Sequence, residues 1–235
     1  MAKEDKQYEF REKEDYIIYL NELIIRTDIH IESQKRYLIE LDKYIRSINI
    51  DKVVRIDYKV YTDFFMKPQY SHMYLLNLLG DSQTVSMSYF KFRNVVVKNR
   101  KKKGNLGFEF RELDTRVDNL LKNMNLKRNW QNHVPESLII AKQKLVNNHE
   151  CNFYKNPIII EDYKYCSLEY FLKLYSSNAK FLDEVLVIYE EMKKDYSNLI
   201  GEDVEILRPE VDTPFNSDFS LVSKMSAKAQ GLLKD

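Results

Sequence analysis

Residues 167–199 read SLEYFLKLYSSNAKFLDEVLVIYEEMKKDYSNL, a stretch without glycine or proline. Its apolar residues recur every three or four positions, which places them along one face of a helix, because an α-helix turns once every 3.6 residues. Gly201 follows and is a typical residue at a helix C-terminus. The sequence therefore predicts one long helix, whose buried face consists of Leu168, Phe171, Leu172, Leu174, Tyr175, Phe181, Val185, Ile188, Tyr189 and Met192.

Other regions carry the same helical periodicity. Residues 3–47 contain no glycine or proline and repeat apolar residues at spacings of three and four. This pattern predicts a long helix or an αα-hairpin, in which Asp28 would cap the second helix. Further helices are expected from about 71 to 98 with an interruption near Gly80, from about Glu109 onward, and around the apolar stripe at 138–146.

Three short segments are ambiguous or favour β-structure. Residues 51–66 alternate apolar and charged side chains as a strand does, yet they also fit one helical face that Asp51 would cap. We favour helix there, because the chain has few turn residues. Residues 156–165 (NPIIIEDYKY) are a short β-type segment, and 203–208 is a second candidate.

The fold prediction is an all-α helical bundle of five to seven helices, with at most a short β element near 156–165. The bundle domain is expected to span residues 1–201. Residues 202–235 contain Pro209 and Pro214, and we expect an extended C-terminal tail that packs on the bundle or is partly mobile, with a weak helix near its end.

Composition excludes several classes of function. The chain has 5 glycines and 5 prolines, against roughly 16 and 12 at average usage, so a glycine-rich cofactor loop is not expected. The 37 basic and 36 acidic side chains give a net charge of +1, which exerts no overall attraction on nucleic acid or membranes. The 2 cysteines form neither a disulfide framework nor a CxxC metal motif. We expect no cofactor and no bound metal.

Two sequence features bear on the cellular compartment. The first residues, MAKEDKQYEF, lack the apolar segment of a secretory signal. No apolar run approaches the ~18 residues that a membrane-spanning helix needs. We expect a cytoplasmic protein without a membrane partner.

The most informative motif is RNWQNH, residues 128–133, which has the form R-N-x-x-x-H. In a helical chain this motif resembles the HEPN superfamily, whose domains carry an Arg and a His with four to six residues between them and a polar residue directly after the Arg. Many members of that family are metal-independent ribonucleases of toxin–antitoxin and phage-defence systems, and others are inactive scaffolds. The resemblance implies a homodimer with a composite active site. It covers these six residues and the helical setting.

The chemistry that the resemblance implies is coherent. His133 would be the general base that removes the 2′-hydroxyl proton of RNA, since imidazole titrates near neutrality. Arg128 would bind the phosphate as negative charge builds up on it. Asn129 would orient either Arg128 or His133. Under this hypothesis all three are catalytic residues. In the alternative interpretation, Arg128 and His133 are ordinary polar residues beside a helix boundary that Pro135 marks.

Two neighbouring features bear on RNA binding. Arg100, Lys101, Lys102 and Lys103 form a basic run that could hold an RNA backbone, and their mutual repulsion predicts an exposed loop. Trp130, the single tryptophan, could stack on a base, but a lone tryptophan is more often a core residue, and we expect it in the core.

The second function class is a non-catalytic helical interaction protein, such as an immunity protein, an antitoxin or a phage-encoded inhibitor. The 17 tyrosines and 12 phenylalanines support it, because aromatic residues are enriched in contact surfaces. The partners to consider are therefore RNA, a second copy of the chain, and another protein such as an antitoxin. Glu190, Glu191 and Asp195 are expected to lie on the solvated face of the last helix, and His72 has no evident carboxylate partner.

Overall fold

The computed structural model describes residues 7–48, 55–104, 106–108, 110–132, 136–149, 162–209, 224–228 and 231. A short antiparallel pair of strands, β1 and β2, aligns Ile56 with Cys166 and Asp57 with Tyr165. The predicted all-α fold of five to seven helices is confirmed. In chain order the elements are α1 (Lys13–Ser47), β1 (Ile56–Asp57), α2 (Tyr58–Met66), α3 (Gln69–Gly80), α4 (Tyr89–Lys103), α5 (Thr115–Asn132), α6 (Ser137–His149), β2 (Tyr165–Cys166) and α7 (Leu168–Ile200).

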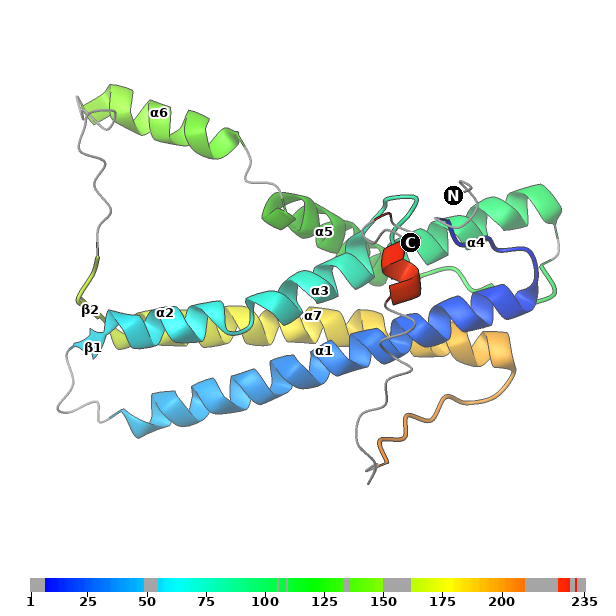
Figure 1. Cartoon of the computed structure of the whole chain (residues 1–235), viewed down its shortest axis with the longest axis horizontal. Coiled ribbons are helices and arrows are strands. Elements are labelled where there is room, and N and C mark those ends of the chain that lie inside the picture. Colours follow the sequence, from blue (N-terminus) through cyan, green and yellow to red (C-terminus); the bar gives the residue numbers. More distant parts are fainter. Residues whose placement is uncertain are drawn as a thin grey trace.

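The two longest helices, α1 and α7, run antiparallel along the length of the bundle (Figure 1). Near one end, Asn21 Nδ2 donates a hydrogen bond to Tyr196 Oη at 3.0 Å. Near the other, the rings of Tyr44 and Phe171 lie 5.2 Å apart. Helices α2 and α3 lie along this pair, and α5 packs against α3 (Figure 1).

The core lies where α1, α3, α5 and α7 meet. The apolar stripe predicted for α7 is largely buried, although Leu172 is 49% exposed. Burial of each such side chain contributes about 1.5–3 kcal/mol to folding. The fully enclosed side chains of this core include Leu20, Leu23, Ile31, Leu41, Leu75, Leu79, Leu121, Met124, Val185, Ile188 and Met192.

The first helix differs from the prediction at its start and at Asp28. It is a single helix of 35 residues, and it begins at Lys13 because the carboxylate of Asp15 accepts a hydrogen bond from the backbone N–H of Glu12 at 3.0 Å. Residues 7–12 are not helical. Asp28 does not cap a second helix. Its carboxylate accepts hydrogen bonds from Tyr189 Oη at 3.0 Å and from Arg208 Nη2 at 2.6 Å, which tie the start of the tail to α1.

The ambiguous segments divide between strand and helix. The helix expected over 51–66 is half right, since Ile56 and Asp57 form β1 and the helix starts at Tyr58, where Asp57 Oδ1 accepts the backbone N–H of Lys59 at 2.9 Å. Residues 51–54 and 156–161 lie outside the described residues. The β segment expected near 156–165 overlaps β2 at Tyr165 alone among the described residues, since 162–164 are not strand. The strand suggested at 203–208 is absent from described residues 203–209.

Two buried carboxylates on α7 correct the expectation that this face is solvated. Asp195 Oδ2 accepts hydrogen bonds from Tyr89 Oη and from Arg93 Nη1, both at 2.7 Å. Its burial raises its pKa, which the Arg93 charge partly offsets. Glu191 pairs with Arg111. These groups join α4 and the segment before α5 to α7. No helix in the described ranges is long and apolar enough to cross a membrane.

Candidate functional site

The R-N-x-x-x-H motif begins on α5, where that helix packs against the end of α3. The two helices approach closely at Gly80, where a Cβ would lie 2.6 Å from backbone atoms of Met124 and Asn125. The side-chain Nδ2 of Asn125 donates a hydrogen bond to the carbonyl of Gly80 at 2.5 Å. Only glycine permits this approach.

We expect Gly80→Ala to lower the free energy of unfolding by about 1–3 kcal/mol, because the added methyl group would force α3 and α5 apart. Helix propensity alone predicts the opposite sign, a gain of about 1 kcal/mol for alanine. Urea denaturation decides between the two. Asn123→Ala, at an exposed position of α5, is the control and should change stability little. A more stable Gly80→Ala variant would contradict the close packing.

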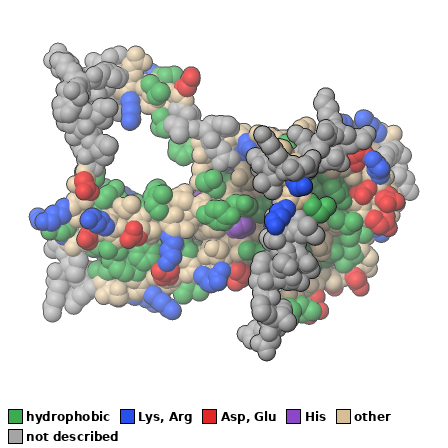
Figure 2. Space-filling view, in the orientation of Figure 1, with side chains coloured by type: hydrophobic (Ala, Val, Ile, Leu, Met, Phe, Trp, Pro, Cys, Tyr) green, Lys and Arg blue, Asp and Glu red, His purple; other side chains and the backbone are tan. Residues whose placement is uncertain are grey.

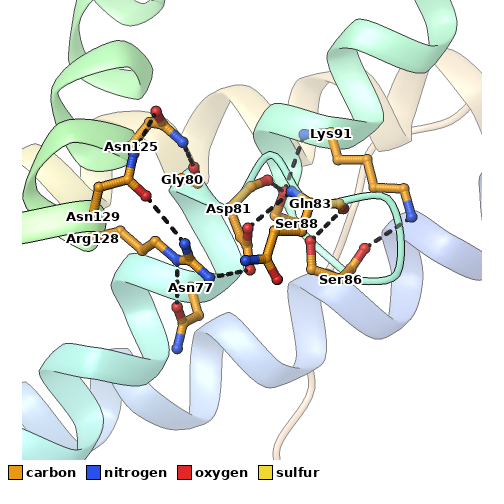
Figure 3. A network of polar contacts seen from close by, with 10 residues as sticks. All are labelled: Asn77, Gly80, Asp81, Gln83, Ser86, Ser88, Lys91, Asn125, Arg128 and Asn129. Carbon is orange, nitrogen blue, oxygen red and sulfur yellow. Dashed lines mark hydrogen bonds and ion pairs between the residues drawn. The ribbon is translucent and has the colours of Figure 1, made fainter. Parts of the chain in front are cut away.

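Arg128 lies in this α3–α5 contact rather than on an open surface (Figure 3). Its Nη2 donates to Asp81 Oδ2 at 3.0 Å, and its Nε donates to Asn77 Oδ1 at 3.2 Å. The side chains of Arg128 and Asp81 are 11% and 7% exposed. The guanidinium that the motif assigns to a phosphate is therefore engaged within the bundle.

Asp81 links Arg128 to the loop between α3 and α4 (Figure 3). Its Oδ1 accepts the backbone N–H of Gln83 at 3.0 Å, and its carbonyl accepts a hydrogen bond from Ser88 Oγ. The same Ser88 Oγ caps α4 by accepting the backbone N–H of Lys91 at 3.0 Å. The ion pair of Arg128 thus helps to fix the path of residues 81–88.

Of the other two motif residues, Asn129 and His133, the structure describes only Asn129. Asn129 is exposed, and its Oδ1 accepts a hydrogen bond from Arg128 Nη1 at 3.1 Å, so the two side chains do interact. His133 lies outside the described residues, as does Pro135. The arrangement of Arg128 and His133 therefore stays a prediction.

The basic run is helical, and the predicted loop is wrong. Residues Arg100, Lys101, Lys102 and Lys103 form the last turn of α4, which ends at Gly104. Positive charge is favourable in the last turn of a helix, because that end of the helix dipole is negative. Arg100, Lys101 and Lys102 are exposed. Helical rise places Lys103 about 21 Å from Tyr89, so α4 carries the run away from the Arg128–Asp81 contact.

Trp130 is 62% exposed, so its expected place in the core is wrong. It lies one turn from Leu126, which is 65% exposed, and both line a groove of about 790 Å³. The groove runs between α5 and α7 and reaches the α2–α3 junction. Its other lining residues are Phe65, Gln69, His72, Lys127, Gln131, Leu174, Ser177 and Asn178.

His72 lies in this groove and is uncharged near neutral pH. Its ring stacks on Phe181, with centroids 3.8 Å apart. Burial, with a smaller contribution from the nearby charge of Lys127, lowers the pKa of His72 to about 4. Gln131 Nε2 donates to Gln69 Oε1 at 3.3 Å. Sequence patterns alone did not single out this cluster, because its members come from three helices.

A second exposed apolar feature is α6. Its side chains Leu138, Ile139 and Ile140 are 43%, 67% and 50% exposed. The helix stands apart from the bundle, with hydrophobic side chains showing on its surface (Figures 1 and 2). Among the described residues, α6 has no extensive contact with another helix.

Neither metal ligands nor relatives identify an activity. Within the described ranges, no three His, Cys, Asp or Glu side chains are grouped to hold a metal ion. Comparisons with protein-family models, curated proteins and solved structures find no match.

Proposed function

We propose that this protein is a non-catalytic helical interaction protein that docks α6 into an apolar groove on a protein partner. The observation that carries this proposal is the exposure of Leu138, Ile139 and Ile140 on a helix without extensive contact to the bundle. A helix of 13 residues is marginal in water by itself. Packing of its apolar side chains on a partner would stabilise it, as in helix-in-groove recognition.

The charge of α6 indicates the chemistry of the partner. Residues 137–149 contain Lys142 and Lys144 and no acidic side chain. An apolar groove with an acidic rim would complement this helix, because opposite charges at an interface speed association and exclude wrong partners. The engagement of Arg128 by Asp81 also favours a non-catalytic role, since that guanidinium already has a structural use.

A charge introduced into the apolar stripe of α6 tests the proposal. The tagged protein should co-purify with one stoichiometric protein from the cells that produce it, and the purified pair should bind in calorimetry. Ile139→Asp should weaken binding at least tenfold, because burial of one such side chain contributes about 1.5–3 kcal/mol. Gln143→Asp, at another exposed α6 position, is the control and should have a much smaller effect. Equal binding by Ile139→Asp and the wild type would exclude α6 as the docking element.

A HEPN-like metal-independent endoribonuclease is the second candidate, and the hydrogen bond between Asn129 and Arg128 favours it. In this mechanism the preorganised Arg128 would hold the phosphate with its remaining N–H donors. His133 would act as the general base, and a homodimer would bring two motifs together. A toxin or defence effector would use such an activity.

RNA cleavage by the purified protein tests this candidate. If it is a ribonuclease, RNA should be cut to products with a 2′,3′-cyclic phosphate, equally with and without EDTA. His133→Ala should then lower the rate by a factor of about 10² to 10⁴, and light scattering should give the mass of a dimer. Intact RNA under all conditions is the result that the non-catalytic role predicts.

A further inference from the structure

The groove between α5 and α7 is lined mainly by apolar and uncharged polar side chains. Trp130, Leu126 and Phe65 are the exposed apolar residues of its lining. Its volume of about 790 Å³ falls within the range of small-molecule sites, which are mostly apolar with a few polar groups that fix the ligand. The proposed docking through α6 does not involve this groove.

The charges in the groove oppose an ionic ligand. Lys127 is the cation among the lining residues, and its Nζ is bound to Glu184 at 2.5 Å. His72 is neutral, since burial keeps its pKa low. Gln69, Gln131 and Ser177 are polar and uncharged. A phosphate or a carboxylate would therefore meet no free positive charge from the lining residues.

Asn178 supplies a hydrogen-bond acceptor without a partner. Its side chain lines the groove, and the residue is 6% exposed. The Nδ2 donates to the carbonyl of Leu174 at 2.8 Å, whereas the buried Oδ1 accepts no hydrogen bond from any residue that the structure describes. A buried acceptor left unpaired is unfavourable, so a ligand N–H that reaches it would bind with a gain in free energy.

We propose that this groove binds an uncharged, planar nitrogen heterocycle of the nucleobase class. The exposed indole of Trp130 offers a face on which a base can stack, and such stacking accepts any base because every base has a π-face. Asn178 Oδ1 is itself enclosed, so the Asn178 amide would turn toward the groove to accept a ring N–H of the base. The neutral imidazole of His72 offers one donor and one acceptor to the same ring. The base comes either from a free nucleoside or from a single-stranded nucleic acid.

Fluorescence of the single tryptophan reports directly on this groove. The full-length protein should be titrated with adenosine, guanosine, cytidine and uridine, and separately with short single-stranded RNA and DNA. Saturable quenching by at least one nucleoside supports a free ligand, and quenching by oligonucleotides alone supports a base within a strand. Inorganic phosphate should cause no change. Absence of quenching and of calorimetric heat with every nucleoside and oligonucleotide would overturn the proposal.

Asn178→Leu separates ligand binding from folding. Leucine has nearly the same shape and removes the unpaired acceptor, so the variant should unfold at the same or a higher denaturant concentration. Binding of the heterocycle should weaken at least tenfold. Asn198→Leu, at an exposed asparagine of the same helix, is the matched control and should bind as the wild type does. Unchanged binding by Asn178→Leu would show that the heterocycle does not use this acceptor, and would overturn the proposed site.

Discussion

Arg128→Ala is expected to lower the free energy of unfolding by about 3–5 kcal/mol, the usual cost of removing one partner from a buried ion pair. The reason is that Asp81, whose side chain is 7% exposed, would keep its negative charge without its cation. The substitution would also leave Asn77 without the Arg128 N–H that it accepts. Urea denaturation of both proteins, with equal m-values, measures the effect.

Two further variants identify the ion pair as the cause. Asn129→Ala removes an exposed side chain that also contacts Arg128, and it should cost about 0.5 kcal/mol or less. Removal of both charges in Arg128→Ala/Asp81→Ala should cost less than the sum of the single changes, since no unpaired charge remains. Stability of Arg128→Ala within 0.5 kcal/mol of the wild type would contradict this arrangement and would return Arg128 to the ribonuclease hypothesis as a surface residue.

This result separates the two proposed functions. The ribonuclease hypothesis, taken from the sequence, expects Arg128→Ala to abolish cleavage while stability stays nearly unchanged. In the structure Arg128 forms an ion pair that stabilises the fold. Loss of activity in Arg128→Ala would therefore not by itself identify a catalytic residue. His133→Ala is the sharper test of catalysis, and its rate should be compared at a temperature where both proteins are folded.

The fold was predictable because the apolar periodicity is dense and breakers are few. The last helix was expected over 167–199, and α7 spans Leu168–Ile200, with Gly201 in the left-handed conformation at φ 83°. The interruption expected near Gly80 is also present, since α3 ends there. These features depend on local sequence, so the spacing of apolar residues along the chain predicts them.

The site was less predictable, because it depends on contacts between distant residues. Trp130 was expected in the core because a lone tryptophan is usually buried, but in the structure it lines a groove. Asp195 was expected on a solvated face, but Arg93 and Tyr89, about 100 positions earlier in the chain, donate hydrogen bonds to it. Mutual repulsion predicted a loop for the basic run, yet the run lies at the end of a helix, where the helix dipole stabilises positive charge. Single-sequence patterns carry none of this pairing information.

Lowering the pH from about 6.5 to about 4 is expected to destabilise the protein through His72. Burial and Lys127 hold the folded-state pKa of His72 at about 4, whereas the unfolded value is about 6.5. Between these values the unfolded state binds more protons, so stability rises with pH and is lost as the pH falls. The shift corresponds to about 3 kcal/mol over the whole window.

His72→Phe isolates this contribution, because phenylalanine can keep the stacking on Phe181 and does not titrate. The free energy of unfolding of each protein should be measured in urea at several pH values from 4 to 7. The difference between the two proteins should shrink or reverse in favour of His72→Phe as the pH falls, whatever the acidic side chains elsewhere contribute to both. Asp195, whose pKa is raised, acts in the opposite direction and cancels in this comparison. A difference that stays constant across the range would mean that His72 titrates as an exposed histidine, and the groove around it would then be open to water and to charge.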